Sequence, residues 1–226
     1  MAEAHKQAEI ASRTPDFMVR EASKPFGWGA ARGAARERVL DVGCGSGWTS
    51  LFLARAGYSV TGIDLVPANV RLTRARAEEW GVDVDARVAD MDALDLGAEF
   101  DFVLVYDALH HSARQADAVR GVARHLAPGA WSLFGEPSWL HRFSPGARAV
   151  TASLGWMERG VSARRLRRDC AAAGLGEFRR FFGGTAPYES RGRGFVWQVA
   201  RLVAANVLVA PQALIWLAAR RPARNP

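Results

Sequence analysis

Two patterns of apolar and polar positions, one typical of strands and one of helices, follow each other along the middle of the chain. Short runs rich in β-branched and apolar residues predict buried strands, and the stretches between them carry apolar residues at helical spacing. The expected strands are residues 38–42, 59–63, 84–88, 102–105 and 131–134, and the expected helices are residues 49–56, 67–80 and 116–126. This alternation predicts an α/β fold with a doubly wound, mostly parallel sheet.

The flanks of this core follow other patterns. After residue 136, Ser144 and Ser162 stand where they can cap two further helices, and residues 178–182 read as a last strand. The expected units are a helical N-terminal cap at 1–36, a ligand-binding core at 37–136, helices with the last strand at 137–194, and an apolar helical segment at 195–226.

The apolar segment near the C-terminus has three candidate environments. Residues 202–219 are 18 residues without a charge, which reaches the lower limit for a membrane span. Asn206, Pro211 and Gln212 weigh against a span, because a bilayer cannot satisfy polar side chains or a broken helical hydrogen bond. We therefore expect two shorter helices that meet near Pro211, buried in the protein's own core, in a homodimer interface or against a membrane surface.

Charge is unevenly distributed along the 226 residues. The net charge is +7, but residues 1–136 carry 15 basic and 19 acidic side chains, whereas residues 137–226 carry 15 basic and 4 acidic ones. A basic second half fits an anionic substrate, a phospholipid surface or nucleic acid, and it also fits a merely solvated face.

Cysteine usage and the N-terminus bear on location and on metals. The two cysteines lack the paired spacing of a disulfide framework or a zinc site, so we expect a reducing compartment and no metal. The first residues lack the apolar core of a secretory signal, which favours the cytoplasm.

A glycine-rich turn follows the first expected strand. Residues 39–49 read VLDVGCGSGWT, and Gly43, Gly45 and Gly47 let the backbone turn sharply and approach a ligand closely. Asp64 ends the second expected strand, where a doubly wound fold presents a carboxylate to ribose hydroxyls. The turn and the acid together predict a nucleoside-binding crevice.

The G-x-G-x-G spacing resembles motif I of the class I S-adenosylmethionine (SAM) methyltransferases. A dinucleotide site would carry a glycine at position 48, where Trp48 stands, so a nicotinamide oxidoreductase is disfavoured. The resemblance continues over residues 38–136 and implies the Rossmann-like fold of that family, with Asp64 on the ribose and Asp90, beside Met91, facing the adenine. The cofactor-binding residues that it implies are Asp41, Gly43, Cys44, Gly45, Gly47, Asp64, Leu65, Asp90, Met91 and Tyr106.

Methyl transfer from a sulfonium needs a nucleophile held in line with the methyl carbon, and a hydroxyl acceptor benefits from a general base. His110 and His111 follow the fourth expected strand, and Glu136 ends the fifth, so each is a candidate catalytic base. Packing against the cofactor is the alternative role for the histidines, and solvation or capping is the alternative for Glu136.

The acceptor is less clearly marked. Residues 135–177 loosely resemble methyltransferases from polysaccharide and glycoconjugate assembly, which suggests Arg159 as a contact for a substrate anion. Trp28 is the second residue expected to bind the substrate. Nucleic-acid amino-methyltransferases carry an Asn/Asp-Pro-Pro-aromatic sequence where this chain has Tyr-Asp-Ala-Leu at 106–109, so no nucleic-acid partner is expected.

The sequence therefore predicts a cytoplasmic SAM-dependent methyltransferase that acts on a small-molecule or glycoconjugate acceptor at an oxygen. Two alternatives stay open: a quinone or lipid methyltransferase at the membrane surface, and a SAM-binding partner protein without catalysis.

Overall fold

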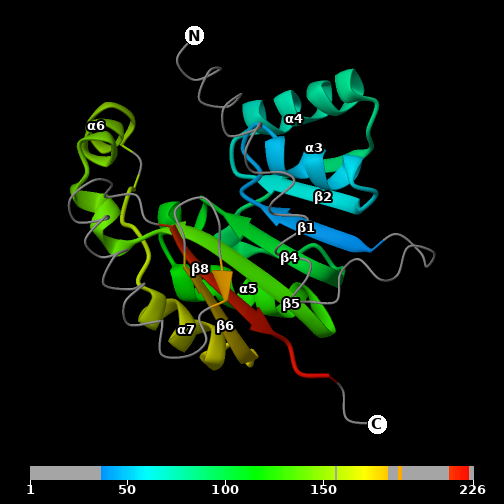
Figure 1. Cartoon of the computed structure of the whole chain (residues 1–226). Helices are drawn as coiled ribbons and strands as arrows, with labels where there is room; N and C mark the ends of the chain where they lie inside the picture. Colours follow the sequence, from blue (N-terminus) through cyan, green and yellow to red (C-terminus); the bar gives the residue numbers. More distant parts are fainter. Residues whose placement is uncertain (1–36, 156, 183–187, 190–213, 224–226) are drawn as a thin grey trace.

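A computed structural model describes residues 37–155, 157–182, 188–189 and 214–223. In these residues one sheet has the strand order β3-β2-β1-β4-β5-β8-β6-β7 (Figure 1). The strands are β1 Arg38–Val42, β2 Ser59–Asp64, β3 Val84–Val88, β4 Phe100–Tyr106, β5 Leu126–Pro137, β6 Gly176–Phe182, β7 Tyr188–Glu189 and β8 Leu214–Arg220. Strands β1 to β5 pair in parallel, and β8 runs antiparallel to both of its neighbours, so the prediction of a doubly wound, mostly parallel sheet is confirmed.

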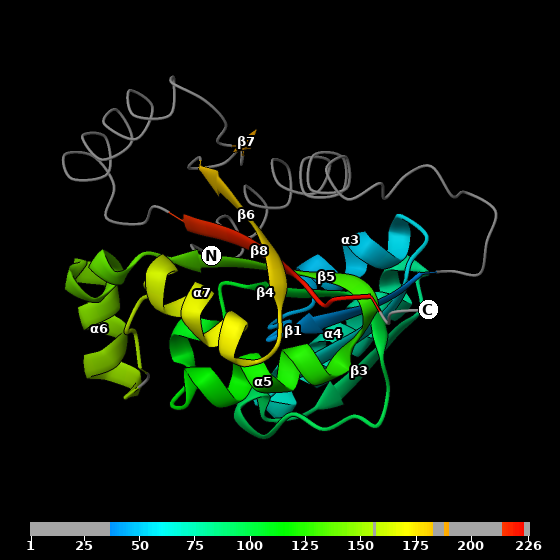
Figure 2. The same ribbon diagram turned by 90° about the horizontal axis from the view of Figure 1, so that it is seen from below.

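Helices cover both faces of the sheet (Figure 2). The helices α3 Trp48–Arg55 and α4 Pro67–Trp80 lie on one face, and α5 Gln115–His125 and α7 Ala163–Ala172 lie on the other. Successive residues of a strand serve the two faces in turn, as in β4, where Phe102 and Leu104 join one apolar cluster and Val103 and Val105 the other. The core is therefore two layers of side chains separated by the sheet.

Local signals set the ends of several helices as predicted. Pro67 occupies the first turn of α4, and Gly81 ends it in the left-handed conformation at φ 61°. Ser144 accepts a hydrogen bond from the backbone of Ala147 at the start of α6 Pro145–Leu154, and Ser162 caps α7 in the same way. The short 3-10 turns are η2 Met91–Ala93, η3 Leu109–His111 and η4 Trp139–Phe143.

The expected helical segment at residues 195–226 is wrong where the structure describes it. Residues 214–220 form β8, which inserts between β5 and β6. Trp216 and Ala218 face one apolar cluster, and Leu217 and Ala219 face the other. A strand buried on both faces is apolar throughout and cannot be told from a buried helix by its periodicity. The prediction of two helices meeting near Pro211 lies outside the described residues, as does the N-terminal cap at 1–36.

Of the three environments expected for the apolar segment, the protein's own core is the one that residues 214–220 occupy. Among the described residues, no helix has both the length and the apolar character that a membrane span requires.

The strand β8 gives a test of this packing. Leu217 is fully buried and pairs in register with Phe134 of β5. We expect Leu217→Ala to lower the free energy of unfolding by about 2 to 5 kcal/mol, because the side chain leaves a cavity in the sheet core. Urea denaturation followed by circular dichroism measures the change.

Leu72→Ala on the exposed face of α4 is the matched control, expected to change stability by less than about 0.5 kcal/mol. Equal, small effects of the two substitutions would contradict a core position for β8.

Candidate active site

The glycine loop joins β1 to α3 and packs against the turn that follows β4. Gly43, Gly45 and Gly47 have φ values of 73°, 54° and 85°, in the left-handed region. A Cβ at Gly43 would lie 2.4 Å from the Cβ of Ala108, and one at Gly47 would lie within 3 Å of the Thr73 side chain. Glycine at 43 and 47 is thus required by close approach as well as by backbone conformation.

Asp64 ties the end of β2 to this loop. Its Oδ2 accepts a hydrogen bond from the backbone N–H of Gly45 at 2.9 Å, and its Oδ1 accepts from the N–H of Val66 at 2.8 Å and from the Asn69 amide at 3.1 Å. These donors fix the carboxylate at the carboxyl edge of the sheet, where ligands of doubly wound folds bind.

A cavity of about 530 Å³ opens beside Asp64, within the usual size of a small-ligand site. Seven of the predicted site residues line it: Gly43, Gly45, Asp64, Leu65, Asp90, Met91 and His111. Asn69, Asp92 and Met157 also line it, and the sequence reasoning missed them. Asn69 and Asp92 come shortly after the ends of β2 and β3, so their positions could have suggested them. Met157 follows α6 and has no such signal.

Other predicted cofactor residues lie behind the cavity. Asp41 is buried and accepts hydrogen bonds from Thr49 Oγ1 at 2.5 Å and Ser50 Oγ at 2.6 Å, so it anchors the first turn of α3. Burial raises the pKa of Asp41 to about 6, against the opposing effect of the two hydroxyls. Cys44 is also buried, and burial raises its thiol pKa, which fits a packing role.

Tyr106 lies in a cluster of aromatic rings rather than in the cavity lining. Its ring centroid is 5.3 Å from that of Trp48 and 5.6 Å from that of Trp216. The tyrosine therefore couples the glycine loop helix to β8 by packing.

Glu136, a predicted base candidate, is fully buried and already surrounded by donors. It accepts hydrogen bonds from the backbone N–H groups of Ala108, Leu109 and His110 at 3.1, 2.9 and 3.2 Å. Its Oε2 is also 2.9 Å from His110 Nδ1. Glu136 orients the turn and the His110 ring and does not line the cavity.

His110 and His111 point to different surroundings. Burial of the His110 ring lowers its pKa, but the hydrogen bond and charge of Glu136, with nearby Asp107 and Glu158, outweigh burial and hold that pKa above its usual value. His111 lines the cavity, and its Nδ1 lies 2.9 Å from the carbonyl oxygen of Met157. Because a carbonyl only accepts, Nδ1 carries the hydrogen, and Nε2 of the neutral ring is an acceptor.

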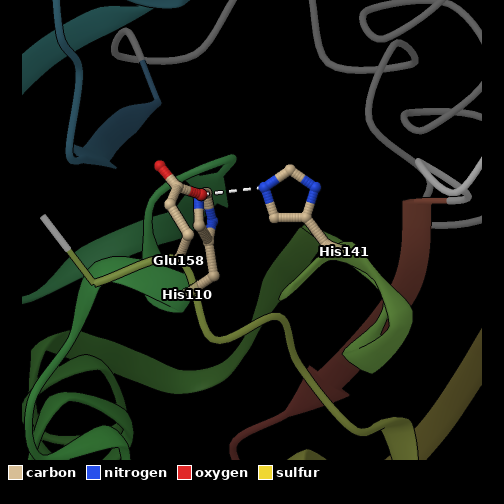
Figure 3. Close-up of side chains that lie close together, drawn as sticks. All are labelled: His110, His141 and Glu158. Atoms are coloured by element: carbon tan, nitrogen blue, oxygen red, sulfur yellow. Dashed lines mark hydrogen bonds and ion pairs between the residues drawn. The ribbon is translucent and has the colours of Figure 1, made fainter. Parts of the chain in front are cut away.

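The structure brings two unpredicted residues to His110. Figure 3 shows the His141 and Glu158 side chains beside its ring, and Glu158 Oε2 lies 2.8 Å from His141 Nε2 and 3.4 Å from His110 Nε2. The sequence singled out the neighbour Arg159 instead, which is exposed and outside the cavity lining. Trp28, the other predicted acceptor contact, lies outside the described residues.

The loop, the acid and the cavity lie at the carboxyl edge of a parallel sheet, which is where doubly wound α/β folds bind nucleosides. Residues 39–129 match the family model described as "Methyltransferase domain". Over these residues, 91 of the 226 in the chain, the protein is similar to methyltransferase domains.

The matches to curated relatives cover only part of this chain and only part of each relative. The chain is 36% identical over 127 residues to the ubiquinone biosynthesis O-methyltransferase of Methylobacterium sp. (strain 4-46), covering 54% of this chain and 50% of that protein. It is 35% identical over 150 residues to the protein of the same name from Methylocella silvestris, covering 62% and 59%. The chain thus spans between half and three fifths of these relatives.

Solved structures share the fold at low identity. A SAM-dependent methyltransferase from Clostridium acetobutylicum superposes with a TM-score of 0.63 at 11% identity, covering 94% of this chain and 92% of that one. The [4+2]-cyclase SpnF gives a TM-score of 0.62 at 23% identity, covering 97% and 81%. Because a cyclase also has this fold, the fold does not by itself decide the reaction.

The buried Glu136 carboxylate predicts a large loss of stability on truncation. Glu136→Ala leaves three backbone N–H groups and the His110 ring without their acceptor. We expect a loss of about 3 to 5 kcal/mol in the free energy of unfolding, measured by chemical denaturation.

Glu99→Ala is the control, because its side chain is 40% exposed and pairs with Arg221 at the surface. It is expected to cost less than about 1 kcal/mol. A Glu136→Ala effect as small as this would mean that the carboxylate does not hold the turn.

Proposed function

We propose that the chain binds SAM in the cavity beside Asp64 and transfers its methyl group to an oxygen of a small acceptor. The observation that carries this proposal is one cavity lined by the glycine loop and Asp64 as well as by the imidazole of His111. Bound SAM would supply a methyl group on a sulfonium cation, and the residues of the cavity would hold the cofactor and the acceptor in line.

Charge in the cavity supports SAM over a dinucleotide. The charged lining residues that the structure describes are four aspartates, Asp64, Asp90, Asp92 and Asp107, together with His111. SAM carries a sulfonium and an ammonium group, which this lining attracts, whereas the pyrophosphate of a dinucleotide would be repelled. The absence of a side chain at Gly43 leaves room for close approach, and exposed Leu65 offers an apolar surface for the adenine.

His111 is the base that this geometry favours among the three candidates. Glu136 is surrounded by protein donors, and His110 is 4% exposed, whereas His111 is 35% exposed and lines the cavity. The Met157 carbonyl fixes the hydrogen on Nδ1 and leaves Nε2 with the lone pair that a hydroxyl proton needs.

The acceptor has two candidate classes. The names of the relatives favour a phenolic hydroxyl of a quinone precursor, and exposed Trp139 and Phe143, with Arg142 stacked on Phe143, offer an apolar and cationic surface near η4 for such a molecule or for a membrane. The net positive charge of residues 137–226 favours an anionic glycoconjugate instead. Peripheral membrane contact belongs to the first alternative, whereas a cytoplasmic location is part of the proposal for both.

Cofactor binding is tested at Asp64. We expect Asp64→Ala to weaken the binding of SAM and of S-adenosylhomocysteine by about 1.5 to 3 kcal/mol, because charge-assisted hydrogen bonds to the ribose are lost and the loop loses its anchor. Isothermal titration calorimetry measures both ligands, with NAD as the comparison.

Asp85→Ala is the matched control, since Asp85 lies on β3 and pairs with Arg87 at the surface. It should leave both affinities unchanged. Tighter binding of NAD than of SAM by the unsubstituted protein would exclude the methyltransferase assignment.

Catalysis is tested at His111 with labelled SAM and two acceptors, a catechol and a nucleotide sugar. We expect His111→Ala to lower single-turnover methylation of the preferred acceptor by about 10²- to 10⁴-fold with little change in SAM affinity. The control is Arg114→Ala in the same loop, whose side chain is 60% exposed.

An unchanged rate in His111→Ala would leave positioning alone as the mechanism. SAM binding without transfer to any acceptor would instead identify a binding protein without catalysis.

A further inference from the structure

We propose that His110, His141 and Glu158 form a binding site for one divalent metal ion, either zinc or one of its neighbours in the first transition series. The three side chains come from η3, η4 and the segment after α6, and they are 4%, 13% and 9% exposed. One nitrogen from each imidazole and one carboxylate oxygen all lie within 4.8 Å of one another. Two imidazoles and a carboxylate are a ligand set that suits zinc and its neighbours in the first transition series.

Two of the three distances between the ligand atoms are close to the edges of a coordination polyhedron. Glu158 Oε2 is 2.8 Å from His141 Nε2 and 3.4 Å from His110 Nε2. Ligand atoms that lie 2.0 to 2.2 Å from a metal in tetrahedral or octahedral geometry are separated from one another by roughly 3 to 3.5 Å. Small side-chain rotations would therefore be enough to admit an ion between the three residues.

Glu136 holds the His110 ring in the orientation that a metal ligand needs. Its Oε2 accepts the hydrogen of His110 Nδ1 at 2.9 Å, which leaves Nε2 to face Glu158. In protein metal sites, the ring nitrogen of a histidine ligand that does not bind the metal commonly donates a hydrogen bond to a carboxylate. This hydrogen bond fixes the tautomer and raises the basicity of the ring. Glu136 is itself fixed by the backbone donors of the turn.

The charge balance of the cluster also favours a cation. Within the part of the chain that the structure describes, the ion pairs of Glu136 and Glu158 are all made with histidines. Glu136 is compensated by the backbone donors of the turn, whereas Glu158, whose side chain is 9% exposed, makes its described ion pairs with imidazoles only. A divalent ion held between these groups would balance the Glu158 charge.

The site lies next to the proposed methyl-transfer cavity. His111 and Met157, the chain neighbours of His110 and Glu158, both line that cavity. Three protein ligands leave a coordination position open. In a role that rests on the proposed function, this position would take the acceptor oxygen and lower its pKa. Metal binding itself does not depend on that role.

The experiment is a metal titration of the full chain. Protein treated with a chelator and then dialysed is titrated with Zn²⁺ by calorimetry, and with Co²⁺ by visible absorption, which reports the geometry of the bound ion. We expect one ion per chain, bound at micromolar or lower concentration, with the d–d bands of a low-coordinate cobalt site.

Two conservative variants test the ligands. Glu158→Gln and His141→Gln keep hydrogen-bonding groups in place but remove good metal ligands, so we expect each to weaken Zn²⁺ binding by about 100-fold or more. Thermal unfolding of the metal-free proteins checks that both variants fold. Glu99→Gln, at an exposed ion pair, is the matched carboxylate control and should bind Zn²⁺ as the unsubstituted chain does.

Absence of stoichiometric binding, or binding that both ligand variants retain, would overturn the proposal and leave a hydrogen-bonded network only. SAM affinity measured on the same samples separates this result from a failure of the proposed function. Zinc binding without SAM binding would support the metal site and refute the methyltransferase proposal, and the reverse result would refute the metal site alone.

Discussion

The carboxylate of Glu136 joins the ends of two central strands at the functional edge of the sheet. It comes from β5 and accepts hydrogen bonds from the backbone of the turn after β4 and from the His110 ring. A fully buried charge is tolerated there because donors surround it. The same turn brings Ala108 against Gly43 and His111 into the cavity, so the glycine loop and the proposed base both depend on this one carboxylate.

Most of the sheet could be predicted because its signals are local. Runs of β-branched residues mark β1 to β4, and Pro67, Gly81, Ser144 and Ser162 mark helix ends by backbone preference and capping. The strand β8 could not be predicted, because it pairs with β5 and β6, which lie far away in the sequence, and its two faces are buried in the two apolar clusters of the core. Its apolar run was equally compatible with a helix.

The residues of the candidate site also divide into those that local sequence signals mark and those that only the fold brings together. Gly43, Gly45 and Asp64 were predicted because they follow strand ends, and strand ends of a parallel sheet meet at one edge. Sequence position does not give the direction of a side chain, so Glu136 was expected as a base although it faces the turn. His141 and Glu158 approach His110 only through the folded path of η4 and α6, which no local pattern encodes.

The place of β8 in the sheet has a consequence for synthesis on the ribosome. Its residues, 214–220, pair with both β5 and β6, yet they leave the ribosome after both of these strands. Until they emerge, β5 and β6 each lack the neighbour that fills their backbone hydrogen bonds, and such open edges invite association between nascent chains. The sheet is completed only when β8 has emerged, which makes the interval between the synthesis of β6 and that of β8 the period of greatest exposure to misassembly and to chaperones.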